Sequence, residues 1–145
     1  MKLLLTFLFF IIPTFSFSQT NETSQVSNAN YASFIMYHRF GDSRYPSTNI
    51  KKEQFLEHIN ELIKPKYNVI RIDKALQAIN NVEPTKDRSV VITIDDAYSS
   101  VYKYAWPIFK KYNLPFTLFV STDVIDNKTP GYMNWEQIRI LRDHG

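Results

Sequence analysis

Apolar residues recur along the chain at two spacings, and the change from one to the other marks the predicted elements. Four short apolar runs rich in β-branched residues predict strands, and a stretch with apolar residues at helical spacing follows each of them. The predicted strands cover 32–37, 68–72, 89–94 and 115–121. The predicted helices cover 51–64, 74–79, a stretch from Tyr98 that Pro107 restarts, and a last helix that begins after Asn134.

The regular alternation of strand and helix predicts the fold class. Ser89–Ile94 is an almost unbroken β-branched run, which is typical of a strand buried on both faces of a parallel sheet. Alternating strands and helices favour an α/β fold with a parallel sheet and right-handed crossovers. Four strands make only half of a barrel, and the sequence stops at Gly145 directly after a predicted helix. We therefore expect a fragment or a truncated gene product.

Residues 1–18 have the parts of a secretory signal peptide. A positive residue, Lys2, precedes an apolar run over 3–12, and small serines stand at the positions before a cleavage site at Gln19. The apolar run is short for a membrane span, which takes roughly 20 residues. We therefore expect export with cleavage rather than an anchor, to the periplasm, the cell surface or the medium. No later segment is long and apolar enough to cross a membrane.

Composition narrows the remaining possibilities. Residues 19–30 are rich in Ser, Thr, Asn and Gln and predict a flexible linker, so the folded domain is expected at 31–145. A net charge of +3 is too small to indicate nucleic acid or an anionic membrane as a partner. The chain has no cysteine, so any metal must be held by histidine and carboxylate side chains. Nothing in the pattern predicts an oligomeric state.

Asp95 and Asp96 are adjacent at the carboxyl end of the most apolar strand. Ligands of α/β folds gather at that edge of the sheet. Two neighbouring carboxylates repel each other unless a positive group binds or one of them takes up a proton. A divalent metal on one carboxylate would remove this cost and leave the other free as a base. In the alternative interpretation, one aspartate caps the following helix and the other is merely exposed.

His38 follows the first predicted strand, so it can reach the same edge as the two aspartates. Its pKa near neutrality suits a proton donor, although a histidine in a loop can also simply satisfy nearby backbone groups. His58 lies on the amphipathic helix and is expected at the surface. His144 stands at a helix end, where a positive charge suits the helix dipole.

Several segments, in the same order, resemble the polysaccharide deacetylase (NodB-type) family. Thr-Ile-Asp-Asp-Ala-Tyr at 93–98 is similar to the family's first motif, Thr-Phe-Asp-Asp-Gly-Tyr, with departures at Ile94 and Ala97. Met-Tyr-His-Arg-Phe at 36–40 resembles the start of the subgroup that acts on exported amino-sugar polymers. Further similarity lies in the next strand and in the helix leading to the second motif, at 114–120, 133–137 and 143–145. The resemblance covers about 31–145.

The resemblance implies the N-terminal part of a distorted (β/α) barrel with parallel strands, which binds zinc or another divalent metal. It also implies hydrolysis of N-acetyl groups of a hexosamine polysaccharide, with release of acetate. By that pattern Asp96 is the metal ligand, Asp95 the general base and His38 the acid. Chitin oligomers, poly-N-acetylglucosamine and peptidoglycan all remain as polymers. Three aromatic residues near strand ends either line the sugar groove or belong to the core: Tyr37, Tyr98 and Trp135.

The family's second motif, with two metal-ligating histidines, would begin beyond Gly145. One carboxylate cannot form a catalytic zinc site with three protein ligands, so we expect the chain as written to bind metal poorly and to be inactive. There are three alternative functions. An aspartyl phosphoryl-transfer enzyme requires two aspartates separated by one residue (Asp-x-Asp), whereas Asp95 and Asp96 are adjacent. A non-catalytic carbohydrate-binding module and an O-acetyl esterase on the same fold remain open.

Overall fold

The computed structural model describes residues 28–143 as strands and helices that alternate for most of their length. The predicted signal peptide, most of the predicted linker and His144 lie outside the described residues. The elements are β1 (Asn28–Ala29), β2 (Ser33–Tyr37), β3 (Arg39–Phe40), β4 (Asn49–Ile50), α1 (Lys52–Leu62), β5 (Asn68–Val69), α2 (Ile72–Ile79), β6 (Thr85–Lys86), β7 (Ser89–Asp95), the π-helical turn η1 (Val101–Ala105), α3 (Trp106–Tyr112), β8 (Thr117–Phe119), α4 (Thr122–Asp126) and α5 (Trp135–Asp143).

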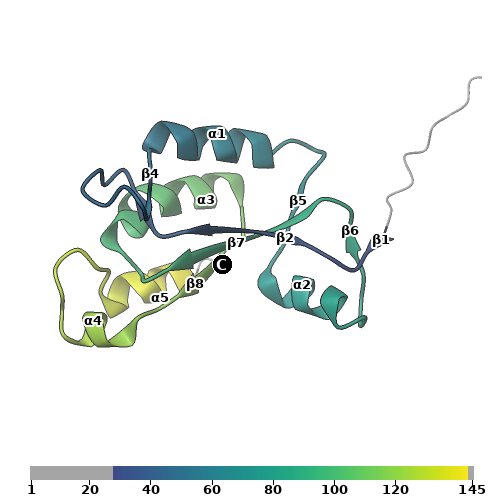
Figure 1. Ribbon diagram of the computed structural model, residues 1–145. Helices are drawn as coiled ribbons and strands as arrows, with labels where there is room; N and C mark the ends of the chain where they lie inside the picture. Colours follow the sequence, from purple (N-terminus) through teal and green to yellow (C-terminus); the bar gives the residue numbers. More distant parts are fainter. Residues whose placement is uncertain (1–27, 144–145) are drawn as a thin grey trace, which may run out of the picture.

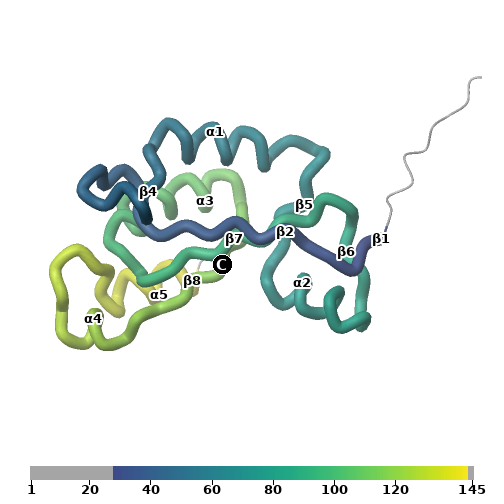
Figure 2. The backbone as a smooth tube through the Cα atoms, viewed as in Figure 1, coloured from purple at the N-terminus to yellow at the C-terminus, as the bar shows by residue number. Residues whose placement is uncertain are grey.

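Strand β7 is the centre of the main sheet. β2 runs parallel to it from the pair Ser33–Val90 to the pair Tyr37–Ile94. β5 pairs with the beginning of β7 and β8 with its end, both in parallel. Figure 1 shows α1 and α3 together on one side of β2 and β7, and the backbone trace in Figure 2 follows the same crossovers. The predicted parallel α/β architecture is confirmed.

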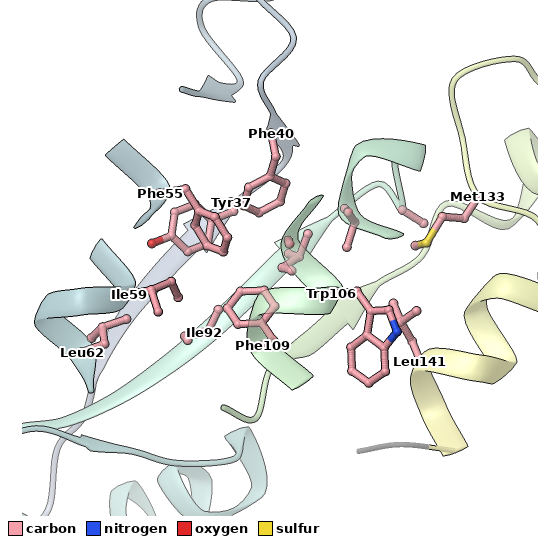
Figure 3. Close-up of a cluster of buried hydrophobic side chains, with 14 of the residues drawn as sticks. Tyr37, Phe40, Phe55, Ile59, Leu62, Ile92, Trp106, Phe109, Met133 and Leu141 are labelled. Carbon is pink, nitrogen blue, oxygen red and sulfur yellow. The ribbon is translucent and has the colours of Figure 1, made fainter. Parts of the chain in front are cut away.

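The core lies between this sheet and the helices α1, α3 and α5. Six of the seven residues of β7 are buried, as its continuous apolar run predicted. Phe55, Ile59 and Leu62 form the buried stripe of α1, and the Phe55 ring contacts those of Phe40 and Phe109 at centroid distances of 4.7 and 5.4 Å. Figure 3 shows these aromatic side chains meeting beside Ile92.

A second, two-stranded sheet involves residues to which the sequence pattern assigned no strand. Asn28 and Ala29, inside the stretch 19–30 expected to be a linker, form β1 and pair with β6. Ala29 is buried, and the Thr85 hydroxyl donates to the carbonyl oxygens of Ala29 and Tyr31 at 3.1 Å each. Strand structure is therefore already present three residues before Tyr31. The sequence pattern does not mark it, because two-residue strands carry no periodic signal.

Two helix beginnings differ in how they are capped. The helix predicted from Lys74 begins at Ile72 as α2, and Asp73 lies in its first turn, where it accepts a hydrogen bond from Arg71. A capping box precedes α5: Asn134 Oδ1 accepts from the Gln137 backbone at 2.8 Å, and Gln137 Oε1 accepts from the Asn134 backbone at 3.1 Å. Among the described residues, no helix has the length and apolar character of a membrane span.

Candidate active site

The two aspartates leave the sheet through an unusual turn. Asp95 is the last residue of β7, and the next two residues have left-handed backbones, with φ of +68° at Asp96 and +56° at Ala97. Such conformations cost about 1–2 kcal/mol each for residues other than glycine, so neighbouring structure must hold them. The Ala97 carbonyl accepts from the Met133 backbone at 2.9 Å, and the Ser99 backbone donates to the Gly131 carbonyl at 2.8 Å. These hydrogen bonds connect the turn after Asp96 to the segment 131–133.

His38 reaches Asp95 across the sheet. Tyr37 is opposite Ile94 in the parallel register, so the next residue of each strand falls at the same edge. His38 Nε2 lies 3.7 Å from Asp95 Oδ2, and both side chains are partly accessible, at 22% and 31% of their surface. The predicted meeting of these two residues at the carboxyl edge is therefore present in the structure, while their chemical roles stay predictions.

Asp96 has a different neighbour. The Ser121 hydroxyl, just beyond β8, donates to Asp96 Oδ1 at 3.3 Å. Sequence reasoning placed Ser121 only at the end of a strand, although a hydroxyl at that edge was a usable signal. Asp95, Asp96 and Ser121 line an open cavity of about 600 Å³. The other lining residues are mostly apolar: Phe34, Met36, Ile72, Thr93, Phe119 and Val120.

The described residues do not complete a metal site. Within 28–143, no three His, Cys, Asp or Glu side chains come close enough together to hold an ion. A catalytic zinc site has three protein ligands. At this edge Asp95 lies beside His38, so Asp96 is the one remaining carboxylate of the pair that could bind a metal. Residues 28–143 therefore place an imidazole 3.7 Å from one carboxylate, with a second carboxylate at the same edge.

Tyr37 does not line the cavity, contrary to one of the two interpretations of the sequence. Its side chain is 5% exposed and packs in the core against Phe40 and Phe55. Successive side chains of a strand point to opposite faces, so a strand that directs Met36 to the cavity directs Tyr37 away from it. The phenol hydroxyl instead meets Nδ1 of His58 on α1 at 2.9 Å, and burial raises the pKa of Tyr37 to about 12.

Tyr98 lies near the carboxylates, but other side chains cover its ring. The Arg39 guanidinium carbon lies 3.5 Å from the ring centroid, and the Tyr132 ring packs against it at 4.7 Å. Burial, a hydrogen bond with Tyr132 and the charge of Asp96 raise the pKa of Tyr98, while Arg39 opposes the shift. The ring is therefore part of a stack and is not free to receive a sugar.

Trp135 makes its contacts with α4 and the core and not with the two aspartates. Its indole N–H donates to Asp126 Oδ1 at 2.7 Å, and its ring packs against the core at the start of α5. These contacts tie α5 to α4. Of the three aromatic residues considered for a sugar groove, Tyr37 and Trp135 thus have their described contacts away from the two aspartates.

Part of the chain is similar in sequence to known proteins. Residues 82–145 match the family model for polysaccharide deacetylase. YxkH of Bacillus subtilis (strain 168), whose name describes it as a candidate polysaccharide deacetylase, is 27% identical over 111 residues, which cover 77% of this chain and 38% of that protein. The chain therefore spans little more than a third of this relative.

Solved structures share the fold. IcaB from Ammonifex degensii aligns with a TM-score of 0.65 at 26% identity, covering 81% of this chain and 51% of that one. The Streptococcus pyogenes deacetylase PplD, solved with acetate, aligns with a TM-score of 0.70 at 19% identity, covering 82% and 54%. A de-N-acetylase from Aggregatibacter actinomycetemcomitans aligns with a TM-score of 0.67 at 22% identity, and the alignment covers 77% of this chain and 50% of that one. By the family match over residues 82–145 and by its fold, the chain is similar to part of a NodB-type polysaccharide deacetylase domain.

Proposed function

We propose that the protein containing this chain hydrolyses N-acetyl groups on a hexosamine polysaccharide, releasing acetate and leaving a free amine on the sugar. The observation that carries the proposal is the 3.7 Å approach of His38 to Asp95 at the carboxyl edge of the sheet. Hydrolysis of an amide needs a base for the attacking water and an acid for the leaving nitrogen. A carboxylate and an imidazole that share one edge can supply both.

In this proposal Asp95 accepts the proton of the attacking water, whose oxygen bonds to the acetyl carbon. His38 then donates a proton to the amide nitrogen as the carbon–nitrogen bond breaks. The carboxylate is 31% exposed and lines the open cavity, so water and substrate can reach it. The short distance between the two groups allows both to act on one acetamide.

Asp96 is proposed as one ligand of a divalent metal, with zinc implied by the family resemblance. Such an ion, when bound, activates water and polarises a carbonyl oxygen. The other ligands are not found together among residues 28–143, so the proposal assigns Asp96 alone. Ser121 holds this carboxylate in place through its 3.3 Å hydrogen bond.

Asp95→Asn in the full-length protein tests the proposal, because the amide keeps the shape of the side chain and removes the base. We expect acetate release from an N-acetylglucosamine oligomer to fall by about 10²- to 10⁴-fold, the usual contribution of general acid–base catalysis. Binding of the oligomer should be retained. Asp123→Asn, which changes an exposed carboxylate in the first turn of α4, is the matched control.

The outcomes separate the candidate functions. Equal acetate release by the wild type and the Asp95→Asn variant would refute the role of Asp95. Sugar binding without any acetate release by the wild type would instead indicate a carbohydrate-binding module. Release of acetate from O-acetylated but not N-acetylated sugars would identify an esterase.

Export is a further part of the proposal, and it rests on the signal peptide expected at 1–18. The mature protein should then begin at Gln19 and occur outside the cytoplasm. Mass spectrometry of the N-terminal peptide from the native host checks this. Recovery of the peptide that contains Lys2 from the exported protein would contradict cleavage.

A further inference from the structure

Four side chains form one stack beside the candidate active site. Tyr132 packs on Tyr98 at 4.7 Å, and the Arg39 guanidinium carbon lies 3.5 Å from the Tyr98 centroid. The same guanidinium carbon lies 4.0 Å from the ring centroid of Tyr45. The stack thus connects the turn after Asp96 with the loop 41–48, and Tyr45 is its outer end.

Tyr45 is the member of this stack with the most accessible ring. It is 46% exposed, whereas Arg39, Tyr98 and Tyr132 are half-buried. The ring is also held from one side by the guanidinium, since cations attract the face of an aromatic ring. An aromatic side chain that is both exposed and fixed loses little conformational freedom when a ligand packs on it.

The loop that carries Tyr45 is fixed at both ends by hydrogen bonds. Arg39 binds Thr48 twice, from its backbone to the carbonyl at 3.0 Å and from Nη1 to the hydroxyl at 2.6 Å. The Asp42 backbone donates to Asn49 Oδ1 at 2.7 Å. Arg44, which also lies beside Tyr45, donates to both oxygens of Asp42 at 2.8 and 2.9 Å. The position of the ring is therefore determined before any ligand binds.

We propose that Tyr45 is the stacking residue of an outer sugar subsite, which binds an N-acetylhexosamine unit at least two units away from the one that is hydrolysed. Arg39 is its positioning residue. This inference rests on the proposed deacetylase function. One face of a pyranose ring presents C–H groups, which pack against an aromatic face in the way that buried apolar groups do. Tyr98 cannot stack on a sugar because Arg39 and Tyr132 cover its ring, so we assign the stacking role to Tyr45.

The inference predicts a dependence on oligomer length. A short sugar occupies the unit at the carboxylates, whereas a longer one also reaches Tyr45. We therefore expect Tyr45→Ala in the full-length protein to weaken binding of N-acetylglucosamine pentamer by about 2- to 10-fold, the range of one aromatic contact. Binding of the dimer should not change. Both dissociation constants are measured by isothermal titration calorimetry, independently of acetate release.

Two further variants and a control make the test specific. Tyr45→Phe and Tyr45→Trp keep an aromatic face and should bind the pentamer as the wild type does. Arg39→Met removes the cation and should weaken the pentamer more than the dimer. Tyr104→Ala is the matched control, because Tyr104 is 40% exposed and also has a cation, Lys52, at 3.7 Å from its ring centroid.

Several results would overturn the subsite. These are equal affinity of Tyr45→Ala and wild type for the pentamer, an equal loss for dimer and pentamer, an equal loss in Tyr104→Ala, or a wild type that binds the pentamer no more tightly than the dimer. Failure of the proposed function is a different result: the wild type binds the pentamer in a Tyr45-dependent way but releases no acetate.

Discussion

Replacing Tyr37 by Phe should change the response of the protein to alkaline pH. The hydroxyl of Tyr37 is 2.9 Å from His58 Nδ1, so its removal should cost about 0.5–1.5 kcal/mol of unfolding free energy near pH 8. A neutral imidazole nitrogen can accept the phenol hydrogen. At this pH the variant is expected to be the less stable of the two proteins.

The difference should reverse at higher pH. Burial raises the pKa of Tyr37 to about 12, while in the unfolded chain a tyrosine titrates near pH 10. Between these values the unfolded state loses the proton and the folded state keeps it, so the wild type loses stability as pH rises. The loss is about 1.4 kcal/mol at pH 11 and approaches about 2.7 kcal/mol above pH 12. The variant has no such proton, and the two stability curves should cross near pH 11.

The assay is urea unfolding followed by tryptophan fluorescence at several pH values from 8 to 11.5, with the two proteins compared at each pH. Tyr104→Phe, which removes a hydroxyl from an exposed ring, is the control and should not cross the wild-type curve. A difference between wild type and Tyr37→Phe that stays constant from pH 8 to 11.5 would refute the reasoning. It would mean that folding does not bury the phenol or does not change its ionisation.

Two other variants test the core and the last helix. Phe55→Ala removes a ring that is 1% exposed and contacts three other aromatic rings, and should lower the unfolding free energy by about 3–5 kcal/mol in urea unfolding. A loss below 1 kcal/mol would show that the core can collapse around the cavity. Asn134→Ala removes the acceptor for the Gln137 backbone and should cost about 1 kcal/mol in the same assay, with faster hydrogen exchange at the start of α5. Unchanged exchange there would contradict the cap.

Features with a local signal were predictable from the sequence. The continuous apolar run of β7 predicts a central strand. The helical spacing of Phe55, Ile59 and Leu62 predicts which face of α1 is buried. The capping box at Asn134 depends on residues three positions apart, so it too could be found. The parallel register then followed from topology, and with it the meeting of His38 and Asp95.

Features that depend on distant pairs were missed. The strand β1 exists because Thr85 lies opposite Ala29, and no periodicity marks a pair of two-residue strands. The covering of the Tyr98 ring requires Arg39 and Tyr132, which come from two other segments. Tyr37 is a different case, since alternation along β2 already implied that it and His38 point to opposite faces. The core position of Tyr37 therefore has a local signal in the sequence.

The position of β7 has a consequence for how the chain folds. In the described part of the chain, β2, β5 and β8 each pair with β7 and with no other named strand. The pairing of Ser33 with Val90 joins residues that are far apart in the sequence, and such non-local parallel contacts form slowly. The amides of β7 should therefore exchange with solvent only through global unfolding. Because His38 follows β2 and Asp95 ends β7, we expect these two side chains to meet only in a chain in which both strands have paired.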